Sequence, residues 1–149
     1  MSDKETRQLD DFLKNASLSD YEKFIQSENS DGYNGLSDFL NSYLAGHELV
    51  LADVIRKSQL SRDYAYSIFN GNRKNPTRDR VIAICMACHM NLSETQRALK
   101  LCNAGVLYAK NNRDAAITIC INREVFDISR VNDFLYEHGL EPLKTSKEG

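Results

Sequence analysis

The sequence predicts an all-α protein, and two observations support this expectation. Apolar residues recur at intervals of three and four along most of the chain, as they do on the buried face of a helix. Residues that break helices are scarce, with seven glycines and two prolines among 149 residues. At this length we expect one main core with short extensions rather than two large domains.

Residues 1–35 are predicted to form an acidic helical arm and a linker. Ser2 with Glu5 and Ser19 with Glu22 have the spacing of capping boxes, and an apolar stripe follows each pair. Turn-forming residues then crowd together up to Gly35 and indicate the linker. The arm carries four cations and eight anions, so we expect it to contact a protein partner rather than phosphates.

Five helices are expected within a domain over residues 36–102. The fourth of them is apolar on almost every side, which is typical of a central buried helix. Thr77 is its expected N-cap, and Ser93 with Gln96 is the expected capping box of the fifth. The apolar positions are Leu36, Phe39, Leu40, Tyr43 and Leu44; Val50, Leu51, Val54 and Ile55; Ala65, Ile68 and Phe69; Val81 to Cys88; and Ala98, Leu99, Leu101 and Cys102.

Residues 103–149 are predicted to be a helical extension that packs on this domain or dimerises. A loop should cover 104–111. In the next segment, residues 115–121 alternate and are rich in β-branched side chains, which suits a strand, but a lone strand would have no partner. We prefer a helix there and leave both possibilities open. The last helix should end at Gly139, and its apolar stripe is Val131, Phe134, Leu135 and His138.

The stretch from Val50 to Pro76 has the pattern of two short helices joined by a tight turn and followed by a basic loop. Ser58-Gln59-Leu60 forms the turn, and Ser61 is the expected N-cap of the second helix. Gly71 suits the left-handed position that closes this helix. These features are typical of a helix-turn-helix, in which the second helix can enter the major groove of DNA.

The net charge of -2 hides a strong segregation of charge along the chain. Between Arg56 and Arg80 there are seven cations and two anions, a balance of +5, so the rest of the chain carries -7. A positive face on an acidic body can supply phosphate contacts while other surfaces repel DNA. The alternative is an ordinary solvated loop that happens to be basic.

From Leu36 to about Leu101 the chain resembles the phage-repressor-like, XRE-type family of bacterial helix-turn-helix transcriptional regulators, whose fold is a compact five-helix domain. The residues that carry the resemblance are Val54-Ile55, the turn Ser58 to Ser61, the inward Ala65 and Ile68, and the stretch Asn70 to Pro76. The family favours Gln, a small residue and Gly where this chain has Leu51, Ile55 and Gln59. The whole chain also resembles small bacterial regulators that extend this domain at both ends.

The resemblance implies that a recognition helix at about residues 61–70 reads base edges in double-stranded DNA. Arg suits guanine and Asn suits adenine, whereas a carboxylate needs a cytosine amine or an Arg partner near phosphates. We expect a homodimer, because one short helix reads only a few base pairs. The candidates for base contact are Ser61, Arg62, Asp63, Tyr66, Ser67 and Asn70, and those for phosphate contact are Asn72, Arg73 and Lys74.

The rival interpretation is a protein-interaction adaptor that keeps the helix-turn-helix fold but no longer binds DNA. Leu51, Gln59, Asp63 and the acidic arm motivate it. We do not expect an enzyme, because the sequence offers neither a catalytic set nor a glycine-rich phosphate loop.

The stretch from Cys85 to His89 matches the Cys-x-x-Cys-His pattern of haem attachment and half of a zinc site. We interpret Cys85 and Cys88 as buried free thiols, because they lie on the apolar stripe of a helix, and we expect no cofactor. No apolar run reaches the roughly 18 residues of a membrane span, and the N-terminus lacks a secretory core. The expected location is therefore the cytoplasm.

Overall fold

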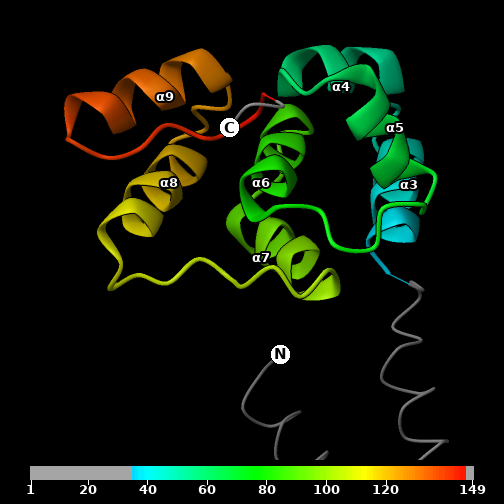
Figure 1. The fold of residues 1–149 in the computed structure, drawn as a ribbon, viewed down its shortest axis with the longest axis horizontal. Helices are drawn as coiled ribbons and strands as arrows, with labels where there is room; N and C mark the ends of the chain where they lie inside the picture. The colour runs from blue at the N-terminus through cyan, green and yellow to red at the C-terminus, as the bar shows by residue number, and fades with distance from the viewer. Residues whose placement is uncertain (1–34, 147–149) are drawn as a thin grey trace, which may run out of the picture. The chain divides into compact units, whose positions relative to one another are not determined.

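The computed structural model describes residues 35–146, and all regular secondary structure in this range is helical. This confirms the all-α prediction for the described range. The helices expected over residues 2–14 and from Ser19, with most of the linker, lie outside it. The described range contains seven helices, labelled in Figure 1: α3 (Leu36–Gly46), α4 (Leu51–Ser58), α5 (Arg62–Phe69), α6 (Arg78–Ala87), α7 (Leu92–Leu101), α8 (Asn112–Asn122) and α9 (Ile128–Glu137).

Helix α6 lies at the centre of the fold. It packs against α4, α7 and α9, and every residue from Arg80 to Cys88 is buried. Figure 1 shows α6 between the group formed by α3, α4 and α5 and the pair formed by α8 and α9. Because neighbours enclose α6, its sequence is apolar on nearly all sides, as predicted.

Helix α3 supports α5 from one side. It packs on α5 and α7 through an apolar face that buries Phe39 and Leu40. Asn41 adds a polar link, because its Nδ2 donates to the carbonyl oxygen of Phe69 at 2.8 Å. That carbonyl belongs to the last turn of α5, where helical carbonyls have no partner within the helix. The carboxyl end of α5 is therefore held in place by α3.

Helices α8 and α9 pack on each other and against the rest of the fold, α8 on α7 and α9 on α6. Residues 115–121 lie within α8, so the preferred helical interpretation is confirmed. The side chain of Asn111 accepts from the backbone N–H of Asp114 at 3.0 Å and starts this helix. Among the described residues no helix is long and apolar enough to cross a membrane.

The predicted capping box of the fifth helix is wrong. The N-cap is Asn91, whose Oδ1 accepts from the Glu94 N–H at 2.9 Å, and Glu94 Oε1 accepts from the Asn91 N–H at 2.9 Å. The helix therefore begins at Leu92, two residues before the predicted first turn. Gln96 has a different partner, because its amide makes two hydrogen bonds with the backbone of Leu107.

The predicted stripe of the last helix needs one correction. His138 is exposed, because α9 ends at Glu137 and the ring lies at the C-cap with Nδ1 2.8 Å from the carbonyl oxygen of Phe134. Ile128, in the first turn, is buried together with Val131 and Leu135. The buried face of α9 is therefore displaced toward its amino end.

Two ion pairs join the first turn of α6 to the first turn of α8. Arg78 donates to both carboxylate oxygens of Asp114 at 2.8 and 2.7 Å, and Arg113 donates to both oxygens of Asp79 at 3.1 and 2.9 Å. Each helix thus supplies one cation and one anion, in bidentate geometry. Arg113 also donates to the carbonyl of Glu141, so the chain beyond α9 is bound to the same place.

Candidate nucleic-acid interface

The turn between α4 and α5 has the predicted form. Gln59 is left-handed with φ of 61°, and the Ser58 hydroxyl accepts from the N–H of the buried Leu60 at 3.2 Å. Ser61 caps α5 by accepting from the Tyr64 N–H at 3.3 Å, which confirms the predicted N-cap. Local hydrogen bonds therefore fix the direction of α5 relative to α4.

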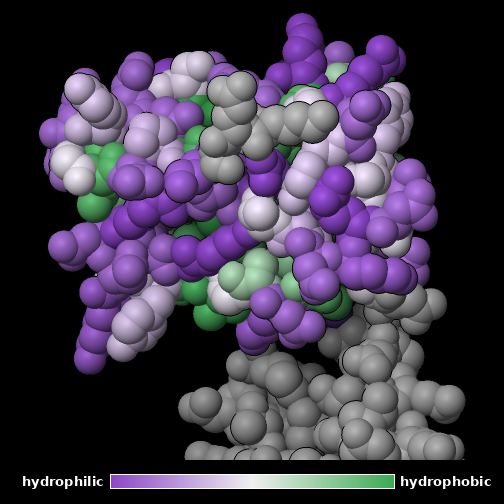
Figure 2. Space-filling view, viewed as in Figure 1, coloured by the Kyte–Doolittle hydropathy of each residue, from purple (hydrophilic) through white to green (hydrophobic). Residues whose placement is uncertain are grey.

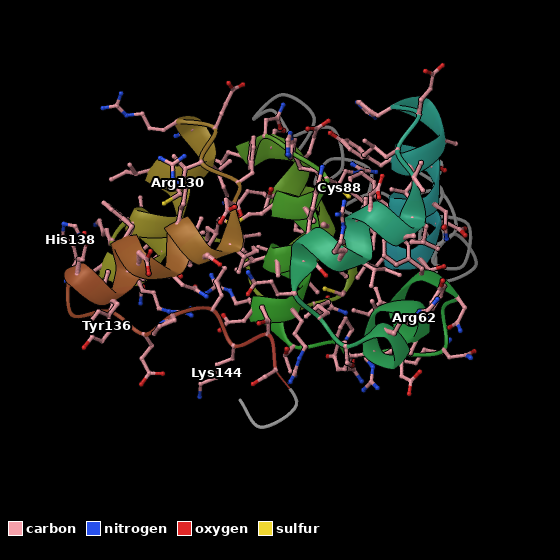
Figure 3. The ribbon with its side chains drawn as sticks, turned by 90° about the horizontal axis from the view of Figure 1, so that it is seen from above. Arg62, Cys88, Arg130, Tyr136, His138 and Lys144 are labelled. Atoms are coloured by element: carbon pink, nitrogen blue, oxygen red, sulfur yellow. The ribbon has the colours of Figure 1, made fainter. Side chains whose placement is uncertain are left out.

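Helix α5 has one buried and one exposed face, as predicted. Ala65, Ile68 and Phe69 are buried. The other face is polar, and Arg62, Tyr66 and Asn70 follow one another at intervals of four on it, so they line one side of the helix. The Arg62 guanidinium lies 6.0 Å from the Tyr66 ring centroid. Figure 3 marks Arg62 on α5, on the side of the molecule away from α9. The predicted contacts Ser61 and Asp63 are exposed beside this row.

Ser67 differs from the other predicted base contacts. It is half-buried, its hydroxyl donates to the Tyr64 carbonyl at 2.6 Å, and it accepts from Arg73 Nε at 2.8 Å. A hydroxyl has a single donor, so this one is occupied inside the protein. Ser67 holds Arg73 rather than extending outward with the row of Arg62, Tyr66 and Asn70.

The loop after α5 folds back on the helix. Gly71 has φ of 82°, the predicted left-handed conformation. Asn70 Oδ1 accepts from the Asn72 N–H at 2.9 Å, and the Arg73 N–H donates to the Ser67 carbonyl at 2.9 Å. The three predicted phosphate contacts, Asn72, Arg73 and Lys74, are exposed on this loop. The loop thus places two cations next to the polar row.

Tyr64 organises this region, and the sequence pattern did not single it out. The guanidinium carbons of Arg73 and Arg80 lie 4.0 and 4.5 Å from the centroid of its ring. Both distances are in the range of cation–π attraction. The Tyr64 hydroxyl also accepts from the Thr77 N–H at 2.9 Å, which ties the end of the loop to α5. No spacing rule connects these residues, so only the fold reveals the cluster.

The positive charge counted from the sequence is only partly available at the surface. Arg78 is bound to Asp114 and to the carbonyls of Gly105 and Val106, and Arg80 is buried. Asp79 is paired with Arg113. Five exposed cations and one exposed anion remain between residues 56 and 80, a balance of +4. These are Arg56, Lys57, Arg62, Arg73 and Lys74, against Asp63.

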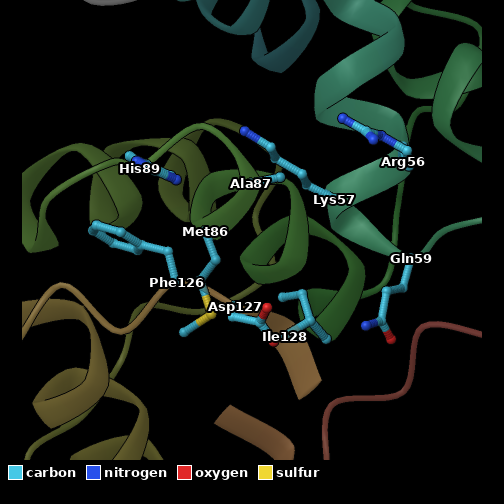
Figure 4. A pocket seen from close by; sticks show the side chains of 9 residues that line it. All are labelled: Arg56, Lys57, Gln59, Met86, Ala87, His89, Phe126, Asp127 and Ile128. Atoms are coloured by element: carbon cyan, nitrogen blue, oxygen red, sulfur yellow. The ribbon is translucent and has the colours of Figure 1, made fainter. Parts of the chain in front are cut away.

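A groove of about 270 Å³ lies between the ends of α4 and α6 and the segment joining α8 to α9, and no residue of the polar row lines it. Figure 4 shows Arg56, Lys57 and Gln59 on one side of it and His89 and Phe126 on the other. The rings of His89 and Phe126 are stacked with centroids 4.8 Å apart.

The outer surface drawn in Figure 2 is mostly hydrophilic, with apolar residues showing in small patches.

The four cysteines are all buried and free, which confirms the predicted buried thiols at Cys85 and Cys88. Burial raises the pKa of the Cys85 thiol well above its usual value and that of Cys88 to about 12. Both thiols are therefore held protonated at neutral pH. Within the described range no group of three or more His, Cys, Asp or Glu side chains could hold a metal ion.

Comparisons with models of protein families, with curated proteins and with solved structures found no match. The class that the described residues define is an all-helical protein in which a capped helix presents a polar row beside a basic loop.

Proposed function

We propose that the protein is a sequence-specific DNA-binding transcriptional regulator that places α5 in the major groove. One observation carries the proposal: the exposed row of Arg62, Tyr66 and Asn70 continues directly into a loop with Arg73 and Lys74. The hydrogen-bonding side chains of the row suit base edges, and the cations of the loop suit phosphates. Helices α3 to α7 would then correspond to a repressor-like five-helix domain, with α4 and α5 as the helix-turn-helix.

The local contacts favour different roles within the set. Arg62 and Tyr66 have side chains free for base edges, whereas the Asn70 oxygen already accepts from the Asn72 N–H and its amide donors remain for a base. Arg73 keeps its two terminal nitrogens for a phosphate, because only Nε donates to Ser67.

A homodimer is part of the proposal, because two recognition helices about 34 Å apart reach successive turns of the groove. Sedimentation equilibrium of the full chain, free and with DNA, measures this.

A salt titration of binding to a site selected from random DNA tests the proposal. Arg73→Ala should weaken binding to selected and random DNA alike and reduce the salt slope by about one. Tyr66→Ala and Asn70→Ala should mainly reduce the preference between sequences. Lys110→Ala is the matched control, because it removes an exposed cation far along the chain from α5. Equal losses on both DNAs for all three α5 and loop variants would contradict the recognition-helix assignment.

The adaptor remains the second candidate, and Asp63 favours it. This exposed carboxylate lies in the first turn of α5 and forms no ion pair within the described part of the chain. A groove lined with phosphates would repel it. A mobility-shift assay with genomic fragments at low salt separates the two functions, because an adaptor should give no salt-dependent shift.

A further inference from the structure

We infer that Arg80 is a positioning residue for the DNA contact of Arg73. We also infer that the chain beyond α9 holds the Arg80 side chain in the position this requires. This inference rests on the proposed function and concerns the regulation of the same surface. We name residues 140–146 the C-terminal strap. The chain of contacts runs from the strap to Arg80, from Arg80 to Tyr64, and from Tyr64 to Arg73.

Arg80 cannot itself be a surface contact. Its side chain belongs to the central helix α6, and the residue is only 9% exposed. One terminal nitrogen donates to the Ser146 carbonyl oxygen and the other to Thr77 Oγ1 at 3.3 Å. With both terminal nitrogens occupied and the guanidinium against Tyr64, its charge acts within the protein.

Tyr64 transmits the position of Arg80 to the loop. The same ring contacts the guanidinium of Arg73, which is exposed and would otherwise be a flexible side chain. Ser67 supplies a second anchor through Arg73 Nε. An arginine held in its binding orientation loses less rotamer freedom when it meets a phosphate, so affinity rises without a new contact.

The C-terminal strap is anchored well before it reaches Arg80. Leu143 is buried and its N–H donates to Asn132 Oδ1 at 2.8 Å. The Lys144 N–H donates to Asp79 Oδ2 at 2.9 Å, beside Arg80 in the first turn of α6. Figure 1 shows the strap, drawn in red, returning from the end of α9 toward the centre of the fold. The position of α9 is thereby linked to Arg80.

The first test is a double-mutant cycle on DNA affinity in the full chain. Arg80→Lys keeps the charge but loses the planar stack and should weaken binding to selected and random DNA alike by about three- to tenfold. In the Arg73→Ala background it should have no further effect, because the two residues act as a unit. A purely structural role would give additive losses and would overturn the inference, as would unchanged binding by Arg80→Lys.

The second test measures Arg73 without DNA. The side-chain Nε–H resonance of Arg73 should move in Arg80→Lys and stay in place in Lys110→Ala. A chain ending at Lys144 should reproduce the shift, whereas a chain ending at Lys147 keeps the Ser146 peptide carbonyl that accepts from Arg80 and should not. If the Arg73 Nε–H resonance does not move in Arg80→Lys, the inference is overturned, even if that variant binds DNA poorly. Absence of DNA binding by the wild-type chain refutes the proposed function and leaves this second test valid.

Discussion

Gln59 donates from Nε2 to the Ser129 hydroxyl oxygen at 2.9 Å and so joins the turn between α4 and α5 to the first turn of α9. Gln59 is left-handed, with φ of 61°. That conformation costs a residue with a Cβ about 1 kcal/mol. The side chain offsets part of this cost by reaching α9, so the left-handed residue of the turn also contacts the C-terminal helices.

Substitutions at Gln59 should separate these two effects. Gln59→Ala keeps the backbone cost and loses the hydrogen bond, so it should lower the free energy of unfolding by about 0.5 kcal/mol. Gln59→Gly loses the same hydrogen bond but removes the backbone cost, and should be about 1 kcal/mol more stable than Gln59→Ala. Urea denaturation measures both, with Ser129→Ala as the control for the hydrogen bond alone. Equal stability of the Ala and Gly variants would contradict the prediction.

Acid should weaken the pairing of α6 with α8. Burial raises the pKa of the Asp114 carboxyl, but the hydrogen bonds and charge of Arg78, with the Tyr108 N–H, outweigh it, so the net pKa is lowered. The stabilisation is therefore present above the unfolded pKa of about 4 and is lost as pH falls further.

Asp114→Asn should lower the free energy of unfolding at neutral pH by about 2 kcal/mol and flatten the acid limb of a plot of melting temperature against pH. Glu141→Gln is the control, because its carboxylate is exposed and lies 3.9 Å from Lys144. An acid limb that stays as steep in Asp114→Asn as in the wild type would refute the role of this carboxyl.

The cysteines should be inert in the native protein. Burial raises the pKa of all four thiols, so the native state disfavours the thiolate that reacts. At pH 8 a chromogenic disulfide reagent should show no fast phase, and all four thiols should react in denaturant. Since the native pKa is raised, stability should be full below the unfolded pKa of about 8.5 and fall above it. A thiol that reacts rapidly before unfolding would contradict this.

The N-cap of α7 can be tested by a matched pair. Asn91→Ala removes the capping hydrogen bond and should lower the free energy of unfolding by about 1 kcal/mol. Ser93→Ala alters an exposed residue inside the helix and should change it by less than about 0.5 kcal/mol. Thermal or urea unfolding compares the two variants, and a larger loss for Ser93→Ala would restore the capping box predicted from the sequence.

The helices and the two faces of α5 could be predicted because their causes are local. Apolar spacing marks a buried face wherever it occurs, and Ser61 and Gly71 mark the ends of α5 by their own chemistry. At α7, by contrast, Asn91 and Ser93 both fit an N-cap, and the local sequence does not decide between them.

The distribution of charge could not be predicted, because its causes are distant in the chain. Nothing in the sequence distinguishes Arg78 and Arg80 from arginines that stay exposed. Only the fold brings their side chains to Asp114 and Ser146. The cluster around Tyr64 was missed for the same reason. Of the contacts that hold α5 and its loop, those from Ser129 and Ser146 come from the C-terminal part of the chain and have no local signal in the sequence.

The enclosure of α6 limits how this protein can be divided. A fragment ending at residue 102 would uncover the side of α6 that α9 covers and leave Arg78 without Asp114. Such a fragment should aggregate through its exposed apolar surface. The exposed loop after α5 thus depends, through Tyr64 and Arg80, on residues that follow α9, so a stable fragment that keeps this loop geometry should include α8, α9 and the chain up to Ser146.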